Sequence, residues 1–435
     1  MIKKFMHLTI WSVFFFAGIS ETLGLPIRLL NFLALGLVML LFVESFIRRS
    51  VKFPLVWIFL GLLGVTWVSG PLLQGTSAVT AFFFFRQLLL LQYLYMFTIA
   101  NESDDRVIHF IKRLILILFL LQPIAAIIKI GTIGFMESYI GTMSIREGSL
   151  TTVAVMVPFA YLFSAYLHKR QRRMLVLMLL FVIFGLAGEK RAIFVFIPLL
   201  LLSMFLFYLY YRKISFVSFL RMGFMFIFMA ISLVYVVVRI NPTLNPEKEV
   251  GGEFDLVYAI EYVERYSNRG NNLQDMSRTQ AIQYLSGYIL SQSPMVILFG
   301  EGAGKLSEAT LDSDKNPIHY YYGIRYGGRM GLAWIFLQIG LVGLGLYIML
   351  FIRMLRYVIR YSKDSQTTVI FFGVWFSIVL DLSIYSMVSI RYFVINGVLF
   401  FMFGMIYRQN ARMQHLKTQA NDTMVGRVNQ EHSQV

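Results

Sequence analysis

The chain has 435 residues, of which 58% are hydrophobic and only 14% are charged, and its mean hydropathy is +0.68. Soluble domains carry about 25% charged residues, so this composition excludes a soluble globular protein, and the absence of cysteine excludes disulfides and a cysteine nucleophile. The formal net charge of +16 does not indicate nucleic-acid binding, because most of the excess lies in short segments between apolar runs.

Apolar runs long enough to cross a membrane recur along the chain. A helix needs roughly 20 residues to span a hydrocarbon core of ~30 Å. Continuous apolar runs favour helices over a β-barrel, whose strands alternate between apolar and polar residues. The sequence therefore predicts an all-α polytopic membrane protein with about twelve transmembrane helices. The expected spans are 6–25, 28–47, 53–70, 79–100, 108–130, 149–168, 174–190, 192–211, 217–238, 331–352, 367–387 and 389–407.

The basic residues between these spans predict the orientation of the chain. Lysine and arginine in short loops stay on the cytoplasmic side of a membrane, and all the basic clusters fall on one side here. Both termini are therefore expected in the cytoplasm. The first span carries Glu21 and no small-residue cleavage site, so it is expected to remain as an anchor in a bacterial inner membrane. The clusters are Lys3-Lys4, Arg48-Arg49 with Lys52, Lys169-Arg170 with Arg172-Arg173, Arg212-Lys213, Arg353 through Lys363, and Arg408 onward.

The spans divide the chain into four regions. Residues 1–238 hold the first nine predicted helices, 239–330 form one large periplasmic loop, and 331–407 hold the last three helices. Residues 408–435 form a polar cytoplasmic tail that is expected to lack regular structure. Loops as long as 239–330 usually carry function.

Three ionisable residues fall inside predicted spans. Arg86 lies midway along the fourth span, whereas Glu21 and Asp381 lie within the first and the eleventh. Charged groups inside a membrane are costly and are functional candidates by default. Arg86 is therefore a candidate substrate-binding residue, and the two carboxylates are candidates for pairing with basic groups inside the bundle.

A charged turn, Gly188-Glu189-Lys190-Arg191, separates the seventh span from the eighth. Its charged side chains either extend to the lipid headgroups or leave Arg191 pointing into an outward-facing cavity, where it would meet an anionic substrate. The sequence leaves both interpretations open.

The large loop contains two predicted helices and a glycine-rich turn. Asn241-Pro242 ends the preceding span, a polar helix covers 261–269, and an amphipathic helix runs from Ser277 to Leu290. The sequence Gly300-Glu301-Gly302-Ala303-Gly304 then requires a tight, irregular backbone. No Lys-Ser/Thr follows it in the register of a P-loop, so a structural turn is favoured over a nucleotide site.

The segment from Ile318 to Arg329 gathers tyrosines, arginines, glycines and a histidine at a predicted membrane boundary. Tyrosines at that depth are typical of an aromatic belt. Guanidinium groups also bind phosphate in a bidentate way, and tyrosine faces stack on sugar rings, so the set suits a diphosphate-sugar ligand as well. The candidate residues are His319, Tyr320, Tyr322, Arg325 and Arg329.

Three blocks in a fixed order carry a resemblance to a known family. They are Gly188–Ala192, the stretch from Ser277-Arg278 through Pro294 to Gly304, and Trp334–Gly345, which reads WIFLQIGLVGLG. With these blocks the chain resembles the bacterial O-antigen polymerase and O-antigen ligase superfamily, including Wzy-type repeat-unit polymerases. The predicted topology agrees with that family over the full length.

The resemblance implies a membrane-embedded glycosyltransferase of the GT-C type, acting at the periplasmic face on oligosaccharides linked to undecaprenyl diphosphate. Such an enzyme uses no nucleotide sugar, and no cofactor or metal is expected. An acceptor sugar hydroxyl attacks the anomeric carbon, the lipid diphosphate leaves, and the configuration inverts. Arginines would stabilise the departing diphosphate. A chain-length regulator and a flippase would be neighbouring partners in the membrane, and no nucleic acid is expected.

The resemblance also assigns residues by position. Arg191 and Arg278 take the positions of arginines that hold the diphosphate. Ligases carry His-Asn eleven residues before the first glycine of a Gly-x-x-Gly motif, which is Gly340 and Gly343 here, but this chain has Arg329-Met330 at that place. This departure favours a polymerase over a ligase.

The general base stays open between two residues. His319 and Glu301 both lie in the loop, and activation of an acceptor hydroxyl requires a base within hydrogen-bond reach. Arg325 lies one helical turn before Arg329 if that segment is helical, so both side chains would face one cavity.

Two alternative functions are weighed against the polymerase. An O-antigen ligase would transfer the glycan to lipid A-core, but the missing His-Asn argues against it. A lipid-linked oligosaccharide flippase or other transporter typically shows a two-fold internal repeat. No such repeat is evident, and the single large loop after the ninth span is asymmetric.

Overall fold

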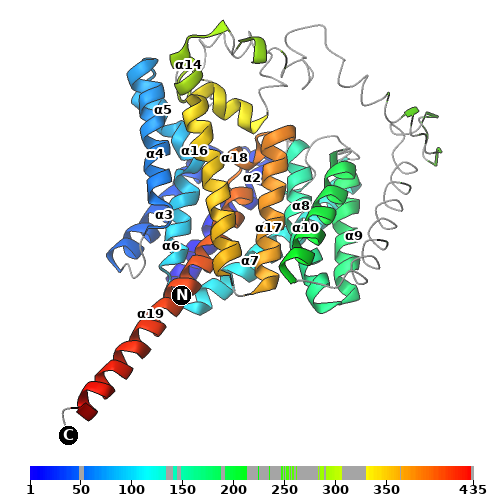
Figure 1. The fold of residues 1–435 in the computed structure, drawn as a ribbon. Coiled ribbons are helices and arrows are strands. Elements are labelled where there is room, and N and C mark those ends of the chain that lie inside the picture. Colours follow the sequence, from blue (N-terminus) through cyan, green and yellow to red (C-terminus); the bar gives the residue numbers. More distant parts are fainter. Residues whose placement is uncertain are drawn as a thin grey trace.

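The computed structural model is built from helices, with no strand among the residues that it describes (Figure 1). It describes residues 1–48, 53–133, 141–144, 148–187, 192–212, 291–305, 330–362 and 364–432, together with single residues and short stretches between 224 and 288. The helices, with π-helical segments labelled η, are α1 (Ile2–Phe15), α2 (Ala17–Thr22), α3 (Ile27–Ile47), α4 (Val56–Trp67), η1 (Val68–Leu73), α5 (Ala78–Phe85), η2 (Arg86–Leu90), α6 (Leu91–Ala100), α7 (Asp105–Ile133), α8 (Gly148–Lys169), α9 (Arg172–Ala187), α10 (Ala192–Arg212), α14 (Pro294–Phe299), α16 (Gly331–Tyr361), α17 (Ser365–Leu380), η7 (Asp381–Tyr385), α18 (Val388–Arg391) and α19 (Phe393–His432).

Seven helical segments in the described part of the chain are long and apolar enough to cross a membrane. Each coincides with a predicted span, so the prediction of an all-helical, multi-pass membrane protein is confirmed at this level. The segments are Leu29–Ile47, Val56–Leu73, Ala78–Ala100, Asp105–Lys129, Gly148–Lys169, Gly331–Tyr361 and Ser365–Tyr385.

The first predicted span, 6–25, is divided in the structure. Helices α1 and α2 meet at Phe16, and segment 141–144 lies against this division. The Gly18 N–H donates to the Thr142 carbonyl at 2.9 Å, and a Cβ at Gly18 would lie only 2.6 Å from the backbone nitrogen of Ser144. The close approach of a distant segment explains why one continuous apolar run does not form one continuous helix.

The remaining predicted spans correspond to helices of the structure to different extents. Spans 174–190 and 192–211 correspond to α9 and α10, and Val195–Tyr211 within α10 is a shorter apolar helix. Span 389–407 falls on α18 and α19. Span 217–238 lies outside the described residues, apart from two single positions.

Helix α19 extends beyond the predicted span as far as His432 and projects from the bundle (Figure 1). The expectation that the segment after 408 lacks regular structure is therefore wrong for the residues up to 432. That segment contains no proline and is rich in glutamine and arginine, both of which favour helices.

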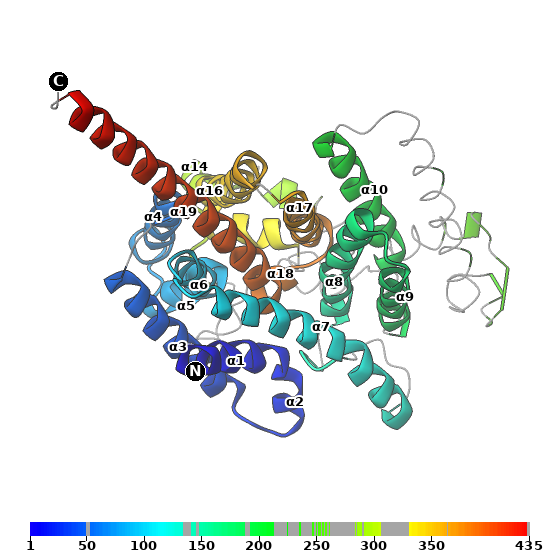
Figure 2. The same ribbon diagram turned by 90° about the horizontal axis from the view of Figure 1, so that it is seen from below.

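Small residues let the helices of the bundle approach closely. Helix α6 runs beside α19, seen from below in Figure 2, and a Cβ at Gly404 of α19 would lie 2.7 Å from the Met96 carbonyl oxygen. Gly373 of α17 packs in the same way against α8, because its Cβ would lie 2.7 Å from the Cβ of Ala160. Close packing at small residues is the usual way in which membrane helices associate.

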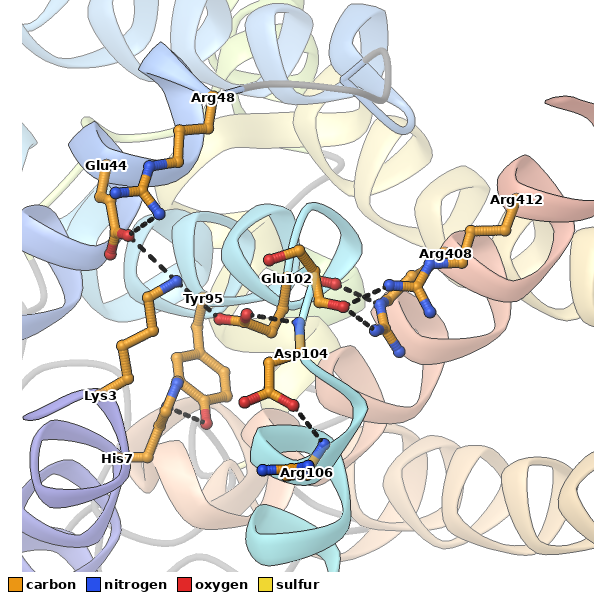
Figure 3. A network of polar contacts seen from close by, with 11 residues as sticks. Lys3, His7, Glu44, Arg48, Tyr95, Glu102, Asp104, Arg106, Arg408 and Arg412 are labelled. Carbon is orange, nitrogen blue, oxygen red and sulfur yellow. Dashed lines mark hydrogen bonds and ion pairs between the residues drawn. The ribbon is translucent and has the colours of Figure 1, made fainter. Parts of the chain in front are cut away.

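The start of α1 and the middle of α19 meet at one end of the bundle, where a polar network joins them (Figure 3). The Lys3 ammonium lies 3.0 Å from the Glu102 carboxylate and 3.1 Å from that of Glu44. On the other side of the α6–α7 turn, Arg408 of α19 pairs with Asp105 at 2.6 Å. We call this end, with Lys3 and Arg408, the proximal end, and the opposite one the distal end.

The proximal end agrees with the predicted topology. Lys3 and Arg408 belong to different basic clusters that were expected on one side of the membrane, and the network places them together. Asn410 of α19 also donates to the Tyr357 hydroxyl near the basic end of α16, at 2.8 Å. The clusters at residues 3, 353–360 and 408 therefore share one end of the molecule.

Candidate functional site

The distal half of α16 contains a break at Gly340. This glycine has φ 64° and ψ −169° inside an otherwise helical segment, a conformation that is essentially restricted to glycine. A break in a helix frees backbone carbonyls that would otherwise accept hydrogen bonds from residues four positions later. Inside a membrane, such carbonyls need other donors.

The glycine-rich segment Gly300–Gly304, the glycine turn, supplies one of these donors. The Glu301 N–H donates to the Leu337 carbonyl at 2.7 Å, and the Gly304 N–H donates to the side-chain oxygen of Gln338 at 2.6 Å. From the other side, the Ser69 hydroxyl donates to the Gln338 carbonyl at 2.6 Å. The freed carbonyls of α16 are thus satisfied by the loop and by η1.

Where the glycine turn meets the break in α16, the two backbones lie too close to leave room for side chains. A Cβ at Gly300 would lie 2.4 Å from the carbonyl carbon of Gln338, and one at Gly340 would lie 2.3 Å from that of Leu298. Gly300, Gly302 and Gly304 all have positive φ. The predicted tight, irregular turn is confirmed.

The segment after η1 covers the other side of the glycine turn. Pro71 lies inside η1, the Gln74 side-chain amide donates to the Gly300 carbonyl at 3.4 Å, and the Thr76 hydroxyl donates to the Ala303 carbonyl at 3.4 Å. π-Helical segments occur often at functional sites. The turn, α16 and η1 therefore form one compact structure at the distal end.

Glu301 is the one candidate base whose position the structure describes. Its side chain is 14% exposed and lies 3.7 Å from the Lys305 ammonium. It lines a shallow depression between α14 and α16, beside Gln292 and Phe336. A general base must come within hydrogen-bond reach of the hydroxyl that it activates, so the role of Glu301 as a base stays a prediction.

A second polar structure, around Asp381, lies next to the start of α16. Asp381 is buried, with 1% of its surface exposed. Its carboxylate accepts a hydrogen bond from the Ser386 hydroxyl. It also accepts two from Ser389, from the hydroxyl at 2.7 Å and from the N–H at 2.8 Å. The Ser386 carbonyl in turn accepts from the Gly331 N–H at 3.0 Å. Serine hydroxyls and a backbone N–H thus bind this carboxylate, and its pairing with a basic group stays a prediction.

Arg86, the other described candidate, is not brought to the glycine turn. It begins η2, and its guanidinium lies over the rings of Phe32 and Phe83, with centroids 5.5 and 5.1 Å from Cζ. Phe84 packs on Trp334 of α16, with ring centroids 5.2 Å apart. Arg86, two residues further along, therefore points away from α16.

The remaining candidates lie outside the described residues. Ala192, which follows Arg191, and Met330, which follows Arg329, are the first described residues of their segments. The candidates concerned are Arg191, Arg278, His319, Tyr320, Tyr322, Arg325 and Arg329.

Sequence reasoning did not single out Gln338, Ser69 or the two serines of the Asp381 structure. A signal existed for Gln338 and for the two serines. Gln338 is a lone amide in the apolar stretch 331–352, and Ser386 and Ser389 follow Asp381 at spacings of five and eight residues. Polar residues at such positions inside a membrane span need partners.

No cluster of His, Asp or Glu side chains in the described ranges is arranged to hold a metal ion. Comparison of the chain with models of known protein families, and with curated protein sequences, gives no match.

Proposed function

We propose that this protein is a membrane glycosyltransferase that polymerises repeat units of a surface polysaccharide. It would transfer a glycan from undecaprenyl diphosphate to a new lipid-linked repeat unit at the periplasmic face of a bacterial inner membrane, with inversion at the anomeric carbon. The proposal includes about twelve spans, both termini in the cytoplasm and the distal end facing the periplasm.

One observation carries the proposal. Two of the sequence blocks that resemble the O-antigen polymerase and ligase superfamily meet at the break in α16. The glycine turn, which ends one block, donates one hydrogen bond to a backbone carbonyl and one to the Gln338 side chain of the other block, Trp334–Gly345. Segments that resemble a family and also meet in space support a shared structural role better than separate sequence matches do. The loop with Arg325 and Arg329 enters α16 only a few residues before this junction.

In this proposal, the arginines bind the diphosphate and stabilise its departure. Arg191, Arg278, Arg325 and Arg329 would supply the positive charge. Glu301 or His319 would accept the proton of the attacking sugar hydroxyl, and Tyr320 and Tyr322 would stack on sugar rings. Neither a cofactor nor a metal is part of the proposal, and a chain-length regulator and a flippase are the proposed partners.

The experiment uses purified protein and a native undecaprenyl-diphosphate repeat unit. We expect a ladder of longer lipid-linked glycans from the wild type, a loss of at least about 100-fold in Arg329→Ala, the scale seen when one charge-stabilising group is removed, and an unchanged ladder in Arg356→Ala. Arg356 is an exposed arginine near the proximal end of α16 and serves as the matched control.

Other outcomes would replace the proposal. If the wild type forms no ladder but labels added lipid A-core, the protein is a ligase. If neither product forms and the lipid-linked oligosaccharide instead changes leaflet in vesicles, the protein is a transporter, a class in which broken helices such as α16 are common.

A further inference from the structure

Arg86 is a membrane-embedded cation without a polar partner in the part of the chain that the structure describes. The defined contacts of its guanidinium are the rings of Phe32 and Phe83. The side chain is partly buried. Phenylalanine rings attract a cation through their faces, but they have no lone pairs that accept hydrogen bonds from it. The N–H donors of Arg86 therefore stay available to a ligand.

The guanidinium faces the outer surface of the bundle. Phe84 marks the face of α5 that packs on α16, and a residue two positions later points roughly 200° away on a helix. Phe32 of α3 is 48% exposed and Phe82 of α5 is 44% exposed. In a membrane, this surface between α3 and α5 meets lipid rather than the interior of the protein.

The depth of Arg86 brings it within reach of the distal headgroups. It lies in the Ala78–Ala100 span, about 12 Å from the distal end of that span at 1.5 Å per residue. Side chains on a helix lean toward its N-terminus, which is the distal end here. Phe32, its partner ring, lies about 8 Å from the distal start of α3 by the same measure.

We propose that the surface formed by Phe32, Phe83 and Arg86, the α3–α5 surface, binds the phosphate of an anionic phospholipid from the distal leaflet. Guanidinium groups pair with phosphate oxygens through two parallel hydrogen bonds. The acyl chains would lie along the exposed apolar residues Leu33 and Leu40 of α3, which lie nearer the middle of the membrane than Phe32. This surface is separate from the glycine turn, so this proposal is independent of the proposed enzymatic function.

The test measures lipid retention by native mass spectrometry of the full chain. Delipidated protein is titrated with dioleoyl phosphatidylglycerol and, separately, with dioleoylglycerol, which has the same acyl chains and no phosphate. We expect the wild type to prefer the phospholipid, and Arg86→Gln to bind it about tenfold more weakly, the scale of one charge-assisted hydrogen bond. Arg356→Gln, which changes an exposed arginine elsewhere, is the matched control and should behave as the wild type.

A second variant keeps the test independent of folding defects. Phe32→Leu retains the charge but removes one ring, and we expect binding between that of the wild type and that of Arg86→Gln. The proposal is overturned if Arg86→Gln retains phosphatidylglycerol with wild-type affinity. It is also overturned if the wild type does not distinguish the two lipids, or if undecaprenyl diphosphate displaces phosphatidylglycerol completely, which would make the α3–α5 surface a substrate site.

Discussion

At the residue scale, glycine positions decide the structure of the distal end. The sequence predicted the glycine turn, because several glycines close together demand an irregular backbone. It did not predict the break at Gly340, since that glycine lies in an apolar run that also fits a continuous helix. What distinguishes Gly340 is the backbone of a distant segment, Leu298–Phe299, against which it packs.

This difference between glycines of one helix is testable. Gly340→Ala forces a side chain into a glycine-only conformation and into contact with the Leu298 backbone. We expect a loss of at least about 2 kcal/mol in stability, measured by thermal unfolding in detergent. Gly345→Ala is the matched control, because a Cβ there meets no atom within 4 Å. It should leave stability unchanged or slightly raised, and equal losses in both variants would contradict the assigned break.

Asp381 gives a second prediction at this scale. Replacing it with alanine leaves the hydroxyls of Ser386 and Ser389 and the Ser389 N–H without their acceptor in a buried place. We expect about 3 kcal/mol of destabilisation for Asp381→Ala and about 1 kcal/mol for Ser389→Ala. Unfolding in detergent measures both. Ser383→Ala changes a partly exposed serine of the same η7 segment and should have little effect on stability. If it lost as much stability as Asp381→Ala, η7 would be sensitive to any substitution, and the role assigned to Asp381 would be wrong.

At the scale of elements, the apolar runs predicted where helices lie but not how they end. Seven runs lie in helical segments long enough to cross a membrane, but one of them, α16, is broken at Gly340. The first run is divided at Phe16 by the approach of segment 141–144. Such interruptions depend on contacts between residues far apart in the sequence, and one sequence without an alignment does not reveal them. The ends that a local signal marks, such as the start of α17, can be recognised from the sequence.

Asp364 caps α17 and makes its stability depend on pH. Its carboxylate accepts from the N–H groups of Gln366 and Thr367 at 3.0 and 3.1 Å. Burial raises the pKa of Asp364, but hydrogen bonds from Thr367 and from these N–H groups outweigh it, so the pKa falls below the ordinary value. A lowered pKa in the folded state means stability that is present above the unfolded-state pKa and is lost as the pH falls through the folded-state pKa.

We therefore expect Asp364→Ala to cost about 1 kcal/mol at neutral pH, and we expect this difference from the wild type to shrink as the pH falls below about 4. Unfolding of both proteins across pH 7 to pH 3 measures it. Asp364→Asn, which keeps a capping oxygen without the charge, should lose less at neutral pH. A difference between Asp364→Ala and the wild type that is constant over the whole range would contradict a charged cap.

At the scale of the whole molecule, the two ends of the bundle differ in chemistry. The sequence predicted that the basic clusters share one side, and the proximal network brings two of them together. The partners were not predictable, since Lys3 pairs with Glu102, a residue 99 positions away. Most of the candidate arginines lie outside the described residues, so their arrangement remains a prediction.

The absence of cysteine makes the proposed orientation directly measurable. Gln409→Cys introduces a thiol at an exposed proximal position, and Ser291→Cys introduces one at an exposed position beside α14. We expect a membrane-impermeant maleimide to label only the Ser291→Cys protein in cells with a permeabilised outer membrane, and to label both after detergent lysis. Labelling of Gln409→Cys before detergent lysis would place the proximal end outside.

The break in α16 also has a consequence for biosynthesis. Its freed carbonyls are satisfied by Ser69 and by the glycine turn, and both precede α16 in the chain. A ribosome makes the chain from the N-terminus, so both of these donors have already left the exit tunnel when α16 reaches the membrane. The broken helix is therefore inserted after the segments that satisfy its freed carbonyls, which shortens the time that these groups spend exposed to lipid.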